Sequence, residues 1–278
     1  MMQLFHTASE RCSRVTTEVY STSFASAIKL LHRDLRHPIY NIYGFVRFAD
    51  EIVDTFHDYD KSSLLSQFKR ETYEALDRKL SLNPILHSFQ LTVNKYAIDR
   101  ELIGAFFTSM EMDLCKTLYD TKKYSDYIYG SAEVVGLMCL YIFCEGNRVL
   151  YEELKSSARS LGAAFQKVNF LRDIKADITG MDRVYFPGCD FLNFTFQDKQ
   201  KIEEDIQNDF TEAYQGILHL PIKARFGVYV AYKYYFSLFN KIKRLNPSRI
   251  MEERIRIPNY GKALIIMRAG VKNKLHLI

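Results

Sequence analysis

The sequence predicts an all-α protein that forms a single domain over residues 1–278. Of these 278 residues 47% are hydrophobic, which is enough for a sizeable core in a chain of this length. Helical spacing of hydrophobic residues continues from end to end, whereas the one alternating run, at 254–258, is short and ends at a proline. With 6 prolines and 12 glycines, the chain has no stretch of linker composition, so nothing divides it into two domains.

Helix signals follow one another along the chain. A first helix is expected at 16–33, and Pro38 marks the start of a second, because proline favours the first turn of a helix. Asn83 and Asp99 are typical N-cap residues and precede helices expected at 84–97 and 100–116. The remaining helices are expected at 62–79, 125–144, 151–178, 199–218, 222–244 and 259–275.

The net charge, the hydropathy, the N-terminus and the cysteines exclude several classes of protein. The net charge of +5 comes from 38 basic and 33 acidic residues that are dispersed along the chain, so we expect no nucleic-acid partner. The longest uncharged helical run, at 134–144, is well short of the ~20 residues that span a membrane. The N-terminus lacks an apolar signal core, and the five cysteines are odd in number and contain no CxxC pair, which indicates reduced thiols in a cytoplasmic protein. These cysteines are Cys12, Cys115, Cys139, Cys144 and Cys189.

A charged stripe borders the buried face of the helix that follows Pro38. Tyr43, Arg47, Asp50 and Asp54 are spaced by 4, 3 and 4 residues, so they share one helix face beside an apolar arc. Carboxylates in that position are costly unless something compensates them, and Arg47 offers one positive charge against two negative ones. This imbalance indicates a bound cation.

A second stripe of the same kind lies about 123 residues further along the chain. Gln166, Asn169, Asp173 and Asp177 share one face of the helix expected at 151–178, again beside hydrophobic residues. Either stripe alone could be an ordinary solvated face with carboxylates four residues apart. The two together favour a site for a hard cation such as Mg²⁺, because carboxylate and amide oxygens, without Cys or His, suit that ion and the phosphates it bridges.

Five ordered segments resemble the squalene/phytoene synthase family of head-to-head prenyl transferases. They carry the S-x-S-F segment, the two aspartate-rich motifs, the Y-G-x-A-x-x-V-G element between them, and the loop after the second motif. The segments are Ser21–Phe24, Tyr43–Asp54, Tyr129–Gly136, Asn169–Asp177 and Arg183–Pro187. The R-x-x-D-E-x-V-D form of the first motif is closer to phytoene synthases than to animal squalene synthases. The resemblance covers nearly the whole chain.

The resemblance implies an isoprenoid synthase fold whose central apolar cavity holds two prenyl diphosphates. It implies two or three Mg²⁺ ions, with Mn²⁺ as a substitute. It assigns catalytic roles to Tyr43, Arg47 and the four aspartates, and metal binding to those aspartates and Asn169. The substrate contacts that it implies are Ser21, Ser23, Phe24, Tyr43, Arg47, Tyr129, Gln166, Asn169 and Arg172. Arg254 and Arg256 are candidates for a phosphate contact, and Thr22 stands where some relatives have a lysine.

The same resemblance implies the reaction. Two geranylgeranyl diphosphates would condense 1-1′ through a cyclopropyl diphosphate to phytoene, in carotenoid biosynthesis, and the product would pass to a desaturase. One alternative is a squalene or dehydrosqualene synthase that uses farnesyl diphosphate, with NADPH needed only for squalene. Another is a non-catalytic relative that serves as an assembly or binding module; it should have lost its metal ligands, and this chain retains them.

Aromatic and small residues are the candidates for the cavity wall. The chain has 20 Phe and 19 Tyr but no Trp, which supplies ring surface for stabilising a carbocation, although a packed aromatic core has the same composition. Gly136 and Gly162 lie on the motif faces and leave room either for a ligand or for close helix packing. The ring residues expected to line the cavity are Phe24, Tyr43, Phe48, Phe106, Tyr129 and Phe165.

The C-terminal segment mixes hydrophobic and basic residues. Between Lys262 and Ile278 it contains no acidic residue, which is typical of a helix at a membrane interface, whereas a terminal helix packed on the core is the alternative that we favour. Because substrate and product are lipids, we expect transient contact with a membrane surface, peripheral on its inner face.

Overall fold

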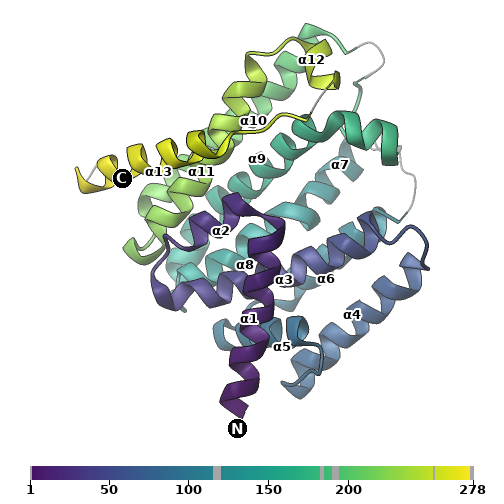
Figure 1. Cartoon of the computed structure of the whole chain (residues 1–278), viewed down its shortest axis with the longest axis vertical. Coiled ribbons are helices and arrows are strands. Elements are labelled where there is room, and N and C mark those ends of the chain that lie inside the picture. Colours follow the sequence, from purple (N-terminus) through teal and green to yellow (C-terminus); the bar gives the residue numbers. More distant parts are fainter. Residues whose placement is uncertain (1, 115–119, 182–184, 190–193, 253, 276–278) are drawn as a thin grey trace.

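The computed structural model describes residues 2–114, 120–181, 185–189, 194–252 and 254–275, and for 176–181 it describes the backbone alone. Helices make up its architecture, and no strand occurs in these ranges, so the predicted all-α class is confirmed (Figure 1). The helices are α1 (Met2–Tyr20), α2 (Thr22–Ile28), α3 (Arg33–Asp54), α4 (Lys61–Arg78), α5 (Pro84–Tyr96), α6 (Arg100–Met112), α7 (Thr121–Ile128), α8 (Val134–Phe143), α9 (Arg148–Met181), α10 (Phe196–His219), α11 (Ile222–Lys243), α12 (Pro247–Glu252) and α13 (Asn259–Lys274), with a π-helix, η1 (Tyr129–Glu133), between α7 and α8.

The prediction of one helix at 16–33 is wrong, because the chain turns at Ser21. The Ser21 backbone is extended, with φ −146° and ψ 98°, and its Oγ accepts a hydrogen bond from the Phe24 N–H at 3.3 Å, which starts α2. The preceding helix, α1, begins at Met2 and buries small polar residues against its neighbours, and Ser13 Oγ lies 2.6 Å from Ser88 Oγ. A buried face made of serine and threonine leaves no hydrophobic periodicity, so residues 2–15 gave no helix signal.

The next helices begin where an N-cap side chain accepts a backbone N–H group. Pro38 lies inside α3, which begins one turn earlier at Arg33, where His32 Nδ1 accepts a hydrogen bond from the Asp34 N–H at 3.5 Å. The predicted start at Pro38 is therefore wrong. Asn83 and Asp99 do cap α5 and α6, as predicted: their side chains accept backbone N–H groups at 3.0 Å and 2.9 Å.

The helix predicted at 125–144 is three elements in the structure. α7 and α8 are joined by η1, whose π-helical turn shifts the register of the side chains that follow it. The helices α4, α5, α9, α10, α11 and α13 match their predicted ranges to within a few residues, and α6 ends at Met112, four residues before its predicted end. The short helix α12 was not predicted.

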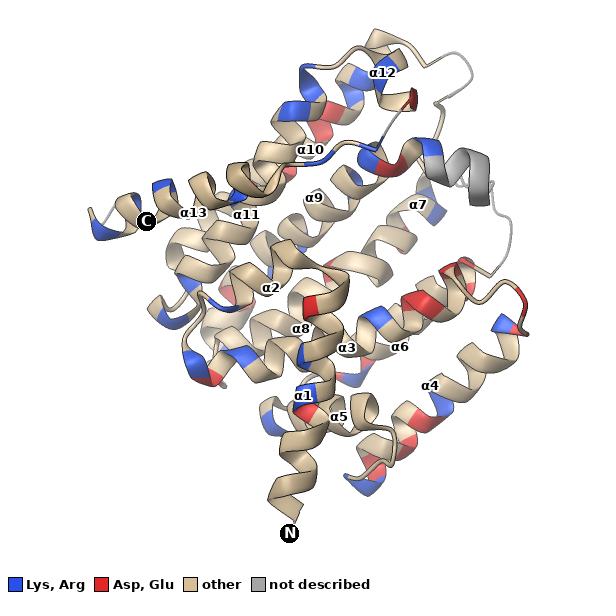
Figure 2. Cartoon of the chain, viewed as in Figure 1, with Lys and Arg blue, Asp and Glu red and all other residues tan. Residues whose placement is uncertain are grey.

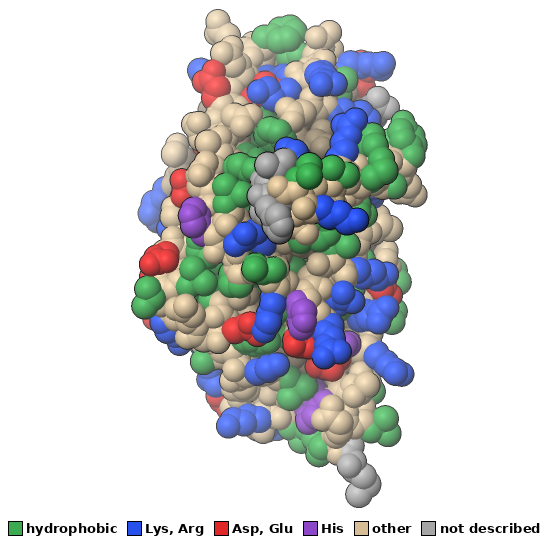
Figure 3. All heavy atoms as spheres, turned by 90° about the vertical axis from the view of Figure 1, so that its left-hand side faces the viewer, with side chains coloured by type: hydrophobic (Ala, Val, Ile, Leu, Met, Phe, Trp, Pro, Cys, Tyr) green, Lys and Arg blue, Asp and Glu red, His purple; other side chains and the backbone are tan. Residues whose placement is uncertain are grey.

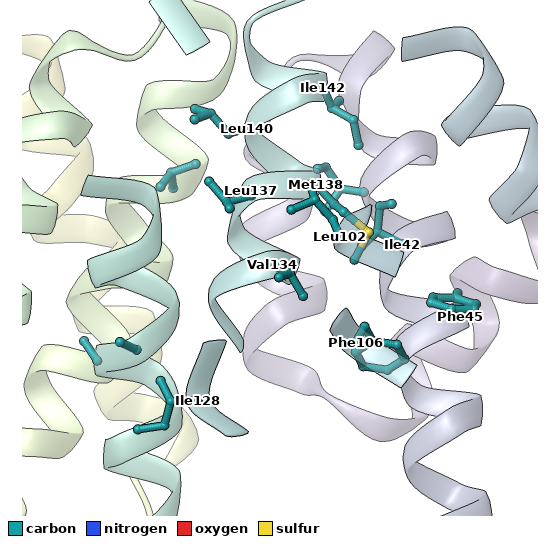
Figure 4. Packing of buried hydrophobic residues seen from close by; sticks show 14 of the residues in the cluster. Ile42, Phe45, Leu102, Phe106, Ile128, Val134, Leu137, Met138, Leu140 and Ile142 are labelled. Carbon is teal, nitrogen blue, oxygen red and sulfur yellow. The ribbon is translucent and has the colours of Figure 1, made fainter. Parts of the chain in front are cut away.

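The core runs around α8, which is hydrophobic on all sides. Leu137 and Leu140 point to one side of α8, whereas Met138 and Ile142 point to the other, toward Ile42 of α3 (Figure 4). One cluster of buried hydrophobic side chains extends from the second helix to the last. This agrees with a single domain over 1–278, which remains a prediction. In the described part of the chain, no helix has the length and hydropathy required to cross a bilayer.

Candidate active site

A cavity of about 590 Å³ lies chiefly between α2, α3, α8, α9, α10 and α11. The C-terminal halves of α3 and α9 place Asp50, Asp54 and Asp173 along its wall. The opposite end is lined by Ile39 near the start of α3 and Leu154 near the start of α9. At 1.5 Å per residue, Ile39 and Asp54 are separated by roughly 22 Å along α3. The cavity is therefore a long slot, charged at one end and apolar at the other.

The α3 stripe faces the cavity as its spacing predicted. Tyr43, Arg47, Asp50 and Asp54 all line the wall. Arg47 forms an ion pair with Glu51, lies 4.0 Å from an Asp50 oxygen through Nη1, and holds its guanidinium carbon 4.4 Å from the centre of the Tyr20 ring. Its Nε is buried without an acceptor in the described structure. Arg47 therefore retains one donor for a ligand, while its charge is paired chiefly with Glu51, which lies outside the stripe.

Asp173 is held between two arginines. Arg172 Nε donates to Oδ1 at 3.0 Å, and its Nη2 donates to Oδ2 at 2.5 Å. Arg254, in the segment before α13, lies with Nε 2.8 Å from Asp173 Oδ1. Both arginines line the cavity, whereas Arg256 does not. Of the two arginines predicted as phosphate contacts, the structure therefore brings only Arg254 to the site.

Asn169 and Gln166 complete the described part of the α9 stripe. Asn169 Oδ1 is buried and accepts no hydrogen bond in the described structure, although the Asn169 side chain bonds to the Tyr235 hydroxyl. A buried amide oxygen without a donor is costly, and it faces a cavity where a cation could satisfy it. Asp177 lies in the same helix, but its side chain is outside the described residues.

Two tyrosines connect the two stripes. The Tyr43 hydroxyl bonds to Ser21 and lies near Arg47 and Asp50, and burial raises the pKa of Tyr43 to about 12. Tyr235 of α11 is partly buried and bonds to Arg172 and Asn169, and burial raises its pKa as well. The Phe24 ring lies between them, 5.7 Å from Tyr43 and 5.9 Å from Tyr235, measured between ring centres. Both hydroxyls stay protonated at neutral pH and remain available as neutral donors.

Comparison with known proteins identifies the family. The model of the family described as squalene/phytoene synthase matches residues 17–205 of this chain. The chain belongs to the squalene/phytoene synthase family. Members of this family are prenyltransferases that use divalent metal ions and act on prenyl diphosphates.

Curated relatives and solved structures agree with this assignment. The chain is 24% identical to the phytoene synthase of Arthrospira platensis, over 96% of this chain and 93% of that protein. It is 26% identical to the chloroplastic phytoene synthase 1 of Zea mays over 85% of this chain, but spans only 62% of that relative. A dehydrosqualene synthase crystal structure with ligand superposes with a TM-score of 0.83 at 19% identity, covering 97% of this chain and 98% of that one. The squalene synthase of Alicyclobacillus acidocaldarius gives 0.73 at 20% identity, covering 85% of this chain and 94% of that one. The structural likeness confirms the isoprenoid synthase fold.

The donor set of this family member fits a divalent cation. Asp50, Asp54, Asp173 and the unsatisfied Asn169 Oδ1 are hard oxygen donors, the kind that Mg²⁺ prefers. Among the described residues, no three His, Cys, Asp or Glu side chains converge closely enough to form a metal site alone. Mg²⁺ usually takes only one or two carboxylates and completes its shell with water and substrate phosphates, which is what this arrangement allows.

Three of the six ring residues predicted to line the cavity do not line it. Phe48 is 39% exposed on the outside of α3. Phe106 is fully buried in the core, where its ring centre lies 5.3 Å from that of Phe45 (Figure 4). Tyr129 packs under the Arg159 guanidinium, with 5.4 Å between them. Phe24, Tyr43 and Phe165 do line it, and so does Ser21, whereas Ser23 does not.

The cavity contains a tyrosine–aspartate pair that sequence reasoning missed. The Tyr127 hydroxyl donates to Asp113 Oδ2 at 2.8 Å, and both residues are buried and line the cavity. A regular helix over 125–144 would place Tyr129 on the same face as Gly136, and the family resemblance implies that Tyr129 contacts substrate. The π-helix between them shifts that register, so the cavity face belongs to Tyr127 instead.

The glycines at the cavity wall are required by close helix packing. A Cβ on Gly136 would lie 2.7 Å from the Ala158 carbonyl oxygen, and one on Gly162 would lie 2.5 Å from that of Ala132. Both glycines also line the cavity, so the same positions allow helix contact and keep the wall open.

Proposed function

We propose that the protein is a phytoene synthase that condenses two geranylgeranyl diphosphates 1-1′ through a cyclopropyl diphosphate intermediate. The main observation behind this proposal is that both aspartate-rich stripes line one cavity, whose opposite end is lined by hydrophobic residues. A charged end suits the diphosphates, and an apolar body suits the prenyl chains. The substrate is proposed from the phytoene synthases among the relatives.

In this proposal Asp50, Asp54, Asn169 and Asp173 would hold Mg²⁺, and Asp177 would join them. Bound there, the metal ions supply Lewis-acid neutralisation of the leaving diphosphate. Arg47, Arg172 and Arg254 add fixed positive charge at the same end of the cavity, so the allylic carbon–oxygen bond breaks with its negative charge already matched.

The rest of the cavity would protect the carbocation. Phe24, Phe165 and Tyr235 form one ring cluster on the wall, with Phe165 and Tyr235 stacked 3.9 Å apart between ring centres. Such faces stabilise positive charge and exclude water, which would otherwise quench the cation to an alcohol. After the second ionisation, a phytoene synthase loses a proton from carbon, so this route needs no reductant.

A second candidate is a dehydrosqualene or squalene synthase that acts on farnesyl diphosphate. The observation that favours it is the overlap of nearly the whole chain with a dehydrosqualene synthase structure. Prenyl length would be set at the apolar end of the cavity, where Leu31, Phe143 and Leu220 line the wall. Only the squalene reaction would require NADPH.

A product assay tests the proposal. Purified protein with Mg²⁺ is given geranylgeranyl or farnesyl diphosphate, with and without NADPH, and the extracted hydrocarbon is identified by mass. We expect a forty-carbon product without NADPH. A thirty-carbon product alone would support the second candidate, and NADPH dependence would separate squalene from dehydrosqualene. No product from either substrate would contradict both candidates and favour a non-catalytic relative.

We also propose a cytoplasmic location with transient membrane contact. Both substrate and product carry long apolar chains, so they reach and leave the cavity from a lipid environment. Hand-off of phytoene to a desaturase would take place on the same surface.

A further inference from the structure

The last helix presents hydrophobic residues to solvent. Tyr260, Leu264, Met267, Val271 and Leu275 are between 39% and 79% exposed. Their spacings of 4, 3, 4 and 4 residues place them on one face of α13, which we call the α13 stripe. A row of large hydrophobic side chains on a surface helix marks an interaction site.

A different face of α13 packs on the protein. Ala269 is buried, and Ile265 and Ile266 pack against the core where α13 lies along α11 (Figure 1). The expectation that the terminal helix packs on the core is therefore correct for this face. The residues of the α13 stripe are exposed and lie on another face than the one that packs on the core.

The charges beside the stripe are all positive. α13 carries Lys262, Arg268, Lys272 and Lys274 and no acidic residue. Figure 2 shows basic and no acidic positions along this helix. In the space-filling view of this side of the molecule, hydrophobic and basic side chains lie next to one another around the C-terminal end of the described chain (Figure 3).

The segment that leads into α13 lies at the cavity. Arg254 lines the charged end with a half-exposed side chain and precedes the start of α13 by five residues. Lys262 Nζ donates to Thr22 Oγ1 at 2.8 Å, which attaches the first turns of α13 to the start of α2. Tyr20, two residues before Thr22, is itself exposed and lines the cavity, and exposed Val19 precedes it. Exposed hydrophobic side chains therefore occur both on α13 and at Tyr20 on the cavity wall.

We infer that the α13 stripe docks on an anionic lipid surface. A helix with one hydrophobic face, flanking cations and no acid binds in the plane of a membrane interface, where lysines attract acidic headgroups. The choice of a lipid partner rests on the proposed function, because its substrates and product carry long prenyl chains that partition into lipid. Another protein or a second copy of the chain would not require a helix whose charges are all positive.

Vesicle sedimentation of the full chain tests the inference without substrate or metal. The probes are vesicles of phosphatidylcholine alone and of phosphatidylcholine mixed with phosphatidylglycerol. We expect the wild-type protein to bind the anionic vesicles. The variant Met267→Asp/Val271→Asp should bind them more weakly, by about tenfold or more. The variant Lys272→Gln/Lys274→Gln, which removes two positive charges, should bind the anionic vesicles about 25-fold more weakly, because each cation near the surface raises the affinity about fivefold.

A matched control tests whether vesicle binding depends on the α13 stripe or on any exposed hydrophobic side chain. Leu82 and Val149 are 91% and 70% exposed on other parts of the molecule, so Leu82→Asp/Val149→Asp should bind vesicles like the wild type. Circular dichroism and the melting temperature of each variant check that the fold is intact.

Two results would overturn the inference. One is equal vesicle binding by wild type and folded stripe variants. The other is wild-type protein that ignores anionic vesicles but self-associates through the stripe, shown by a mass in solution that Met267→Asp/Val271→Asp reduces. An absence of prenyl coupling in the product assay would instead contradict the proposed function and leave the vesicle result standing.

Discussion

Asp173 and Arg254 form an ion pair, with Arg254 Nε 2.8 Å from Asp173 Oδ1, although 81 residues separate them in the sequence. Arg172 donates to both oxygens of the same carboxylate. A cation that binds Asp173 must therefore share it with, or displace, at least one guanidinium. We expect Arg254 to transfer from the carboxylate to a diphosphate when substrate and metal bind, because it is the more exposed of the two.

The first prediction compares Arg254→Gln with Arg256→Gln. Arg254 lines the cavity and Arg256 does not, so the first variant should lose about 10- to 100-fold in kcat/KM for the diphosphate substrate and the second should be unchanged. Steady-state kinetics on both variants provides the measurement. Equal losses in the two variants would mean that the loss comes from the lower positive charge of the protein and not from the missing contact of Arg254 with the site.

The second prediction concerns the carboxylates themselves. Asp173→Asn and Asp50→Asn should each reduce turnover by about 100-fold or more, since a neutral amide cannot balance a bound cation. Both variants should keep the helical fold in circular dichroism, although Asp173→Asn also loses its ion pairs with Arg172 and Arg254. Asp126→Asn is the control, because Asp126 pairs with Lys122 on the exposed surface of α7. Wild-type turnover in either cavity variant would refute the metal assignment.

The third prediction distinguishes two neighbouring tyrosines. Tyr127 donates to the buried Asp113 inside the cavity, whereas Tyr129 packs under Arg159 outside it. Tyr127→Phe removes a hydroxyl from the cavity wall and should lower kcat, and Tyr129→Phe should not. We would measure kcat and KM for both variants. If the segment were a regular helix, Tyr129→Phe would lower kcat and Tyr127→Phe would not.

The fourth prediction is a loss of stability in mild acid that depends on His87. Its buried Nδ1 accepts the Ser81 N–H at 3.3 Å, so Nε2 carries the proton and donates to His6 Nδ1 at 2.8 Å. Burial, and then the proximity of His6, lowers the pKa of His87 below its usual 6.5. The neutral form is favoured in the fold, so its stabilisation is complete above pH 6.5 and is lost as the pH falls through the lowered value.

Melting curves between about pH 7 and pH 5 measure this effect. The melting temperature of the wild type should fall across that range, and the fall should be smaller in His87→Gln, whose amide can accept the Ser81 N–H without titrating. His219→Gln on the exposed end of α10 is the control and should match the wild type. Parallel pH curves for wild type and His87→Gln would show that another group dominates.

The sequence predicted the α3 stripe well because an uninterrupted helix preserves its periodicity. Tyr43, Arg47, Asp50 and Asp54 all reach the cavity as their spacing required. The same rule failed around Tyr129, because nothing in the local composition signals a π-helical turn. It also failed for α1, whose buried face is built from serine and threonine.

Contacts between distant segments could not be read from the sequence. The pairing of Arg254 with Asp173 and the position of Tyr235 between the two stripes depend on how α11 and the last segments fold back over α9. Similarly, Phe106 and Phe165 have the same chemistry, but the first packs in the core and the second lines the cavity. Tertiary packing alone separates these cases.

The measurement that tests the central claim most directly is a crystal structure with Mg²⁺ and an unreactive geranylgeranyl thiodiphosphate. We predict that the diphosphates lie between Asp50 and Asp54 on one side and Asn169 and Asp173 on the other, with the prenyl chains running toward Phe143. Arg254 should have left Asp173 for a phosphate oxygen. Diphosphates bound elsewhere, or metal ions that contact neither aspartate stripe, would contradict the account.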